Sequence, residues 1–156
     1  ASSSNVYGYF TGGSYSGVLG EDTNTNKFDF SVESISVGPS FISPESTHTR
    51  QHSVCSTNRY SYFIGGTADL ATNRINRLDF SNDLFSSLGN IMPLATSFAS
   101  GSESYLYGYL VGGKGTPTFV YYSTIQRLDF STDTASSPGN NLSSSKISAA
   151  PVSNSN

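Results

Sequence analysis

The sequence is poor in charged side chains and in cysteine, and it contains no tryptophan. Charged residues make up 12% of the chain, about half the usual share of a soluble domain, and Lys and Arg together number only 8. A surface that binds nucleic acid needs a basic patch, so this composition argues against a nucleic-acid partner. The single cysteine, Cys55, excludes an internal disulfide, and we expect it to be a small buried strand residue.

Long apolar segments are missing too. No run approaches the roughly 20 residues of a membrane-spanning helix, and residues 1–4 lack the basic and then apolar pattern of a signal sequence. We therefore expect no membrane partner. Helical periodicity is also absent, whereas aromatic residues, which favour strands, make up 13% of the chain, and Ser, Thr, Asn and Gly fill the polar positions. These features predict an all-β chain with almost no helix.

Two motifs occur three times each. The first has the form Tyr-Xaa-Tyr-Xaa-Xaa-Gly-Gly and occupies residues 7–13, 60–66 and 107–113. The second ends in an apolar-Asp-Phe-Ser sequence whose aspartates are 50 residues apart: Asp29, Asp79 and Asp129. A fixed period of this size is typical of repeat folds, in which each repeat is one supersecondary unit. We therefore predict a single domain, residues 1–156, that contains three tandem repeats.

Within each repeat the pattern predicts four short strands. The Tyr-Xaa-Tyr segment is the second strand, and it follows a first strand such as residues 53–56. The third strand alternates with a period of two, so Arg127 and Asp129 share a face and are expected to pair. A Ser-Xaa-Asp or Ser-Xaa-Glu turn then leads to the fourth strand. The double glycines suit backbone that takes positive φ or approaches a neighbouring strand closely.

A strand ending in Gly-Gly, followed by a variable loop and a strand ending in Leu-Asp-Phe, resembles the kelch repeat, as does the Met92-Pro93 pair. The resemblance covers essentially the whole chain and implies a β-propeller of four-stranded antiparallel blades. The kelch tryptophan is absent, with Ile35, Phe85 and Ala135 near its place, so we expect Phe and Tyr to pack the blades together. Kelch propellers include enzymes, adhesins and protein-binding modules, so the fold does not assign a function.

Three blades cannot close a ring, because propellers have roughly four to eight blades. An open arc leaves apolar blade faces and sheet edges in water, and proteins normally cover such surfaces. We therefore expect a homodimer that closes to six blades. A homotrimer with nine blades is a less usual count, and a longer propeller of which this chain is a part is the alternative. Residues 146–152 resemble a first strand, so we expect them to complete the blade begun by the N-terminus of the other copy.

Residues suited to catalysis or metal binding are sparse. His48 and His52 are the only histidines, and along a strand their side chains lie about 13 Å apart, too far for one metal ion. We interpret them as surface loop residues and predict no metal site and no cofactor. The sequence has no Gly-Xaa-Ser-Xaa-Gly nucleophile elbow, and carboxylates repeated in every copy suit a structural role better than a catalytic pair. We therefore predict no catalytic residues and no enzyme activity.

The loop after each double glycine differs among the repeats, and variable loops on a rigid scaffold commonly carry binding. Four aromatic residues in these loops suit stacking on a sugar or contact with a protein: Tyr15, Phe119, Tyr121 and Tyr122. Packing between blades is the alternative role for them. We therefore predict a non-catalytic scaffold or binding module, with a lectin-like glycan binder and a fragment of a propeller enzyme as alternatives. The Ser- and Asn-rich style favours an extracellular or virion-surface setting.

Overall fold

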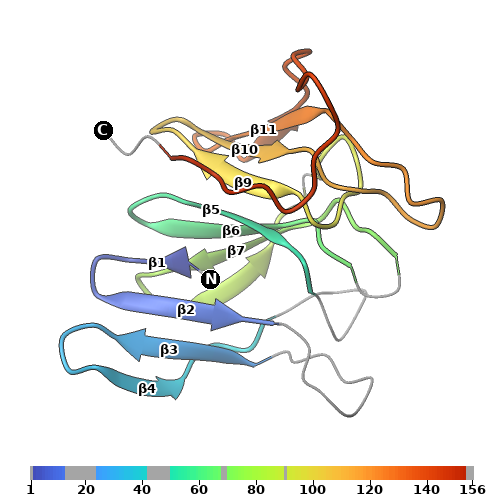
Figure 1. The fold of residues 1–156 in the computed structure, drawn as a ribbon. Coiled ribbons are helices and arrows are strands. Elements are labelled where there is room, and N and C mark those ends of the chain that lie inside the picture. Colours follow the sequence, from blue (N-terminus) through green and yellow to red (C-terminus); the bar gives the residue numbers. More distant parts are fainter. Residues whose placement is uncertain (1, 13–23, 42–49, 68–69, 90, 154–156) are drawn as a thin grey trace, which may run out of the picture.

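The computed structural model describes residues 2–12, 24–41, 50–67, 70–89 and 91–153. Over these ranges the chain forms three four-stranded antiparallel sheets, one from each repeat (Figure 1). The described residues contain no helix, and hence none that could cross a membrane. The predictions of an all-β chain and of four strands in each repeat are confirmed.

In every sheet the strands lie side by side in chain order. Sheet 1 contains β1 (Ser2–Ser3), β2 (Tyr7–Thr11), β3 (Thr25–Asp29) and β4 (Ser34–Val37). Sheet 2 contains β5 (Ser53–Ser56), β6 (Tyr60–Ile64), β7 (Ile75–Asp79) and β8 (Leu84–Ser87). Sheet 3 contains β9 (Ser100–Glu103), β10 (Tyr107–Val111), β11 (Ile125–Asp129) and β12 (Thr134–Ser136).

The three sheets share one register. The second tyrosine of each Tyr-Xaa-Tyr segment lies opposite the basic residue of the third strand: Tyr9 opposite Lys27, Tyr62 opposite Arg77, and Tyr109 opposite Arg127. Because side chains alternate between the two faces of a strand, residues at equivalent register positions point to the same face of their sheets. A contact made by one sheet can therefore be compared residue by residue with the other two.

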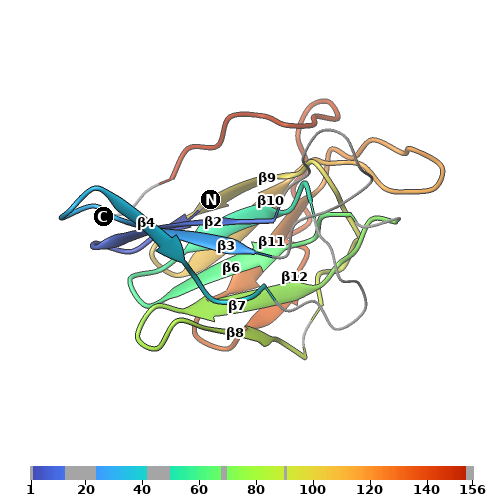
Figure 2. The same cartoon turned by 90° about the horizontal axis from the view of Figure 1, so that it is seen from below.

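The sheets stack in chain order, sheet 1 on sheet 2 and sheet 2 on sheet 3 (Figures 1 and 2). Their first strands are neighbours, since β1 contacts β5 and β5 contacts β9. One apolar cluster between sheets 1 and 2 includes Tyr9, Phe41, Phe63, Leu78 and Phe85. A second between sheets 2 and 3 includes Tyr62, Ile64, Ile75, Leu110 and Leu128. The sheets are thus packed by aromatic and aliphatic side chains, in an arrangement consistent with propeller-like blades.

The turn between the third and fourth strands follows directly from its sequence. The aspartate that ends the strand accepts two hydrogen bonds from the serine two residues later; for Asp79 the Ser81 backbone N–H lies at 2.8 Å and its hydroxyl at 2.6 Å. The equivalent hydroxyl and N–H bonds lower the pKa of Asp29 and Asp129. The turn ends on an acidic residue with a φ of 53°, 56° or 54°: Glu33, Asp83 and Asp133.

The double glycine holds the segment that leads to the next sheet. Gly65 and Gly66 have φ values of 68° and 94°, a region that side chains with a Cβ rarely adopt. The Gly66 N–H donates a hydrogen bond to the carbonyl of Thr96 at 2.8 Å. A Cβ on Gly65 would collide with that same carbonyl oxygen. The structure therefore confirms both requirements predicted for the glycine pair, positive φ and close approach.

Candidate functional site

The contact between sheets 1 and 2 is organised around one carboxylate, Asp83. The fully buried Tyr9 donates a hydrogen bond from its hydroxyl to Asp83 at 2.7 Å, and the Lys27 ammonium forms an ion pair with the other carboxylate oxygen. The Tyr9 ring stacks on Phe80, with 5.4 Å between the ring centroids. Burial and the Asp83 carboxylate raise the pKa of the Tyr9 phenol, so its hydroxyl remains a donor at neutral pH.

The contact between sheets 2 and 3 repeats this arrangement at Asp133. Tyr62 donates its hydroxyl hydrogen to Asp133 at 3.0 Å, and the Arg77 guanidinium lies 2.6 Å from the other carboxylate oxygen. The Tyr62 ring stacks on Phe130 at 5.1 Å. We call this arrangement the carboxylate clamp. Its donor half consists of a tyrosine and a basic residue of one sheet. Its acceptor half consists of the turn carboxylate, which both of them bind, and the phenylalanine of the next sheet, on which the tyrosine stacks.

The basic residue of each donor half lies over the ring of the first tyrosine in its own sheet. The Lys27 ammonium lies 3.7 Å from the Tyr7 centroid. The guanidinium carbons of Arg77 and Arg127 lie 4.5 and 4.6 Å from the centroids of Tyr60 and Tyr107. Such cation–π contacts restrict the conformation of a long side chain. In all three donor halves the charged group therefore lies over the first tyrosine, whether or not a carboxylate is bound.

The predicted pair of Arg127 and Asp129 forms no direct ion pair, although the charge of Arg127 adds to the Ser131 hydrogen bonds that lower the pKa of the Asp129 carboxyl. The Asp129 carboxylate instead accepts hydrogen bonds from the backbone and hydroxyl of Ser131. Arg127 packs over Tyr107 and donates a hydrogen bond from Nε to the Ser136 hydroxyl at 3.3 Å. The two side chains share a face, but the aspartate is already satisfied by its own turn, and the arginine extends toward the outer surface of the sheet.

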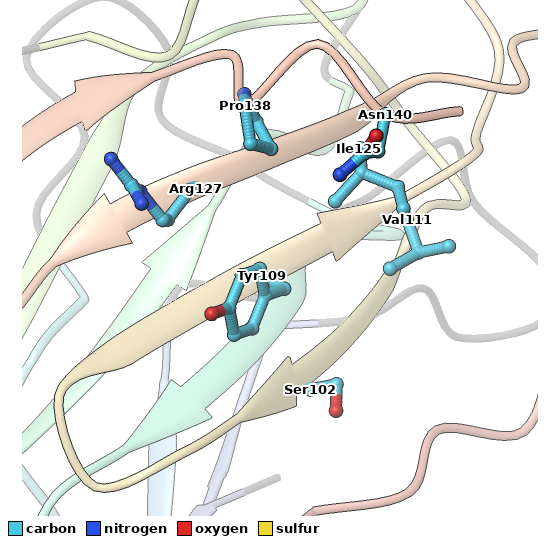
Figure 3. A pocket seen from close by; sticks show the side chains of 7 residues that line it. All are labelled: Ser102, Tyr109, Val111, Ile125, Arg127, Pro138 and Asn140. Carbon is cyan, nitrogen blue, oxygen red and sulfur yellow. The ribbon is translucent and has the colours of Figure 1, made fainter. Parts of the chain in front are cut away.

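Sheet 3 presents a donor half that has no carboxylate within the described residues. A cavity of about 320 Å³ opens on the face of sheet 3 that points away from sheet 2 (Figure 3). It is lined by Ser102, Tyr109, Val111, Ile125, Arg127, Pro138 and Asn140. Val111 and Ile125 occupy the register positions of Ile64 and Ile75, which are 0% exposed because sheet 3 covers them. The cavity is thus the uncovered counterpart of the surface that sheet 2 buries.

Sheet 1 presents an acceptor half at the opposite end of the stack. Glu33 stands at the turn position of Asp83 and Asp133, and it forms no ion pair in the part of the chain that the structure describes. Phe30 stands at the position of Phe80 and Phe130, and it is 50% exposed. The end of the stack formed by sheet 1 therefore carries an acidic residue and a phenylalanine in the places that a donor half occupies elsewhere.

Apolar side chains surround this acceptor half. Phe10 is 52% exposed, whereas Phe63 and Leu110, its counterparts in sheets 2 and 3, are 1% exposed. Ile35 is 69% exposed, whereas its counterpart Phe85 is buried. Exposed apolar side chains that are contiguous on one sheet face are characteristic of an interaction surface.

Residues 146–152 lie along the first strand of sheet 3 (red in Figure 1). The Gly113 N–H donates to the Lys146 carbonyl at 2.8 Å, and the Ser100 hydroxyl donates to the Ala149 carbonyl at 2.7 Å. The segment 50 residues earlier makes the same bonds with sheet 2, at 2.8 and 2.7 Å: Gly66 to Thr96 and Ser53 to Ala99. These residues therefore have the contacts of the segment that leads into a first strand, while completion of a blade by another copy stays a prediction.

The predicted binding residues lie in different surroundings. Phe119 and Tyr121 are 60% and 56% exposed on the loop between β10 and β11 (orange in Figures 1 and 2). The Lys114 ammonium lies 4.9 Å from the Phe119 ring centroid. The Tyr122 hydroxyl lies close against Gly115, and Tyr15 falls outside the described residues. Phe119 and Tyr121 thus lie on the same loop, and both are exposed.

His52 lies in the loop before β5, as interpreted, but it is half-buried against aromatic rings rather than at the surface, so that part of the interpretation is wrong. Its ring stacks on Phe41 and meets the edge of Phe63, at centroid distances of 5.7 and 5.3 Å. Burial lowers the pKa of His52 to about 4, which leaves the ring neutral at physiological pH. His48 falls outside the described residues. Within the described ranges, no three His, Cys, Asp or Glu side chains are grouped so as to hold a metal ion.

Cys55 lies in β5 and is 1% exposed, which confirms its predicted place as a small buried strand residue. Its thiol hydrogen points toward the backbone carbonyls of Ser102 and Tyr109. Burial raises the pKa of the thiol to about 12, so the reactive thiolate is scarce at neutral pH.

Comparisons with known proteins do not assign the chain to a family. A scan against models of protein families found no match, and a search among curated proteins found no similar sequence. The kelch resemblance therefore stays a prediction, and the role of the two end faces rests on their geometry.

The strand and turn patterns alone do not reveal the clamp, because Glu33, Asp83 and Asp133 are also ordinary residues for their turns. A signal is nevertheless present. Charged residues are scarce in this chain, yet a basic residue and an acidic residue recur at the same places in all three repeats. The repeated aspartates at the strand ends are explained by the hydrogen bonds of their own turns, whereas the repeated basic residue and the second acidic residue have no such local role and therefore point to contacts between repeats.

Proposed function

We propose that the protein is a non-catalytic β-propeller scaffold or binding module that assembles with a second copy into a closed ring of six blades. The observation that supports it is the pair of end faces. Sheet 3 exposes a donor half with Tyr109 and Arg127, and sheet 1 exposes an acceptor half with Glu33 and Phe30. A head-to-tail contact between two copies would join these halves and cover the apolar surface around them.

Two copies are favoured by the usual size of propellers. Six blades lie within the common range of roughly four to eight, whereas a trimer would need nine. A two-fold axis makes both head-to-tail contacts at once, so neither end face remains in water. Closed symmetry also removes the risk that such contacts propagate into open filaments.

The C-terminal segment fits the same assembly. β1 pairs with only Tyr9 and Gly8 of β2, whereas β5 and β9 each pair with four residues of the next strand. The 50-residue period puts Ala150 and Pro151 in the register opposite Thr11 and Phe10. We therefore place these two residues beside β1 of the second copy, so that the closing blade contains residues from both chains.

Size-exclusion chromatography with light scattering tests the assembly. A mass of twice the chain mass of 16.6 kDa is expected over a wide range of protein concentration. A well-folded species with the mass of one chain, at every concentration, would remove the basis for ring closure.

A lectin-like role is the second candidate, and the exposed aromatic pair on the β10–β11 loop favours it. Phe119 and Tyr121 offer ring faces suited to stacking on a sugar. A glycan array would show binding that is lost in a Phe119→Ala/Tyr121→Ala double variant. Tyr105→Ala provides the matched control, because Tyr105 is 77% exposed but lies outside this loop. The absence of binding to any glycan on the array would count against this role.

A further inference from the structure

We propose that the ring closes through a third carboxylate clamp, in which Tyr109 and Arg127 of one copy hold Glu33 of the second copy. The Tyr109 ring stacks on Phe30 of that copy. This inference rests on the proposed self-assembly and specifies the surfaces and the residues that carry it. Two such contacts form in each ring, one at either end of each chain.

The acceptor half is already shaped for this contact. Glu33 has the same backbone conformation as Asp83 and Asp133, with a φ of 53° against 56° and 54°. The same Ser-Xaa-acidic turn therefore presents an acidic side chain from the same backbone position, and the Glu33 carboxylate reaches one methylene group farther from the backbone than an aspartate. Phe30 directly follows the third strand, as do Phe80 and Phe130, so the stacking ring is present as well.

The donor half is pre-organised too. The rings of Tyr107 and Tyr109 lie edge to face at 6.3 Å, against 6.2 Å for Tyr60 and Tyr62 in the occupied clamp. Arg127 sits over Tyr107 at nearly the distance that Arg77 keeps from its own tyrosine. A side chain that is already held in its bound conformation loses little entropy on binding. Tyr109 and Arg127 thus lack only the carboxylate.

The apolar parts of the two end faces are complementary in size. Between sheets 2 and 3, Ile64 and Ile75 pack in one cluster with Leu110 and Leu128. At the outer face of sheet 3 the position of Ile64 is held by the smaller Val111, beside the cavity of about 320 Å³. At the outer face of sheet 1 the positions of the two leucines are held by the larger rings of Phe10 and Phe28. In the proposed contact, the larger side chains of the sheet 1 face thus pack against the smaller residue and the cavity of the sheet 3 face.

Charge fixes the direction of the contact. A contact between two copies of the sheet 3 face would bring Arg127 against Arg127, and one between two sheet 1 faces would bring Glu33 against Glu33. Like charges at an interface oppose association, whereas the head-to-tail contact pairs opposite charges. The partner that fits both faces is therefore a second copy of the chain, placed so that its sheet 1 follows sheet 3 as sheet 3 follows sheet 2.

Charge exchange tests the clamp. Glu33→Arg and Arg127→Glu should each raise the dissociation constant of the dimer by roughly 30-fold or more, because each leaves like charges at both contacts of the ring. The two variants should nevertheless form a heterodimer when they are mixed. In that heterodimer one contact is native, and the other pairs the two exchanged charges. Arg59→Glu is the matched control: Arg59 is 65% exposed, its ion pair is with Asp79 of its own sheet, and it belongs to neither end face, so any cost falls on folding stability and not on the dimer.

The outcomes separate this inference from the proposed function. If the wild-type chain is monomeric, self-assembly and the clamp both fail. This outcome includes the case in which a different protein covers the two end faces. If the wild type is dimeric but both charge variants remain dimers, self-assembly stands and the clamp is overturned. If both variants are monomeric by light scattering and folded by circular dichroism, yet do not form a heterodimer on mixing, the head-to-tail contact is overturned.

Discussion

At the residue scale, two charged side chains organise the places where sheets meet. Asp83 and Asp133 each accept a hydrogen bond from a tyrosine hydroxyl and form an ion pair with a basic side chain, both from the neighbouring sheet. Hydrogen bonds to a carboxylate are stronger than bonds between neutral groups, and these are partly shielded from water. Because the donors and the acceptor come from different sheets, the bonds specify the order and spacing of the sheets in addition to stabilising them.

Gly65→Ala should destabilise the fold by about 2 kcal/mol, because a φ of 68° costs a residue with a Cβ about that much. The new methyl group would also displace the Thr96 carbonyl that Gly66 binds. Chemical denaturation measures the change. Gly89→Ala is the control: a Cβ there meets nothing within 4 Å, so its effect should stay within about 0.5 kcal/mol. Equal effects of the two substitutions would contradict this account of the double glycine.

Stability should fall as the pH drops below the ordinary histidine pKa of 6.5, since burial lowers the pKa of folded His52 to about 4. In this range the unfolded chain binds the proton and the folded chain does not, so acid favours unfolding. The contribution of His52 is complete above pH 6.5, and roughly 3 kcal/mol of it is lost on the way to pH 4. Denaturant titrations at several pH values should show a flatter profile for His52→Phe. An unchanged profile would show that His52 is protonated equally in both states.

Individual residues were predicted from the sequence where the cause is local. The positive φ of Gly65 and the buried thiol of Cys55 follow from the residue types and the strand pattern. The position of His52 between Phe41 and Phe63 was missed, because Phe41 lies outside the strands and carries no motif. The partners of Lys27 and Arg77 were missed because the carboxylate that each basic residue meets belongs to the following sheet.

At the element scale, strands and turns were largely predictable because the repeat presents each pattern three times. An alternating strand, an Asp-Phe-Ser turn and a double glycine fix where each strand ends, and a tight hairpin needs no distant partner. The contacts of the loops after the double glycines were not predictable. Their sequences differ among the repeats, and Phe119 takes a φ of 50° that no local signal indicates.

Deletion of residues 147–156 should weaken self-association without unfolding the three sheets. The segment is bound to sheet 3 by edge contacts such as the Ser100–Ala149 hydrogen bond, while both apolar clusters lie elsewhere. We expect an unchanged circular dichroism spectrum and a larger monomer fraction in sedimentation velocity. Ser53→Ala, which removes the equivalent bond inside the chain, should leave the monomer fraction unchanged. A truncated chain that still dimerises with wild-type affinity would show that the segment takes no part in closure.

At the scale of the whole molecule, the two ends of the stack expose positions that the interior of the stack covers. Positions that are buried or half-buried between sheets carry the exposed residues Phe10, Phe30 and Ile35 at one end, and a cavity lies beside Tyr109 at the other. Each repeat therefore carries both a donor half and an acceptor half. Inside the stack these halves pair, and at its two ends one half of each kind is left without a neighbouring sheet. A protein that is stable in water is expected to cover such faces.

A structure of the assembled particle, by crystallography or electron microscopy, would show directly whether two copies close a ring. We expect six blades around one axis, with Glu33 of each copy held between Tyr109 and Arg127 of the other. Two arcs that meet through like faces, or a single arc whose sheet 1 and sheet 3 faces remain in solvent, would contradict ring closure through the clamp.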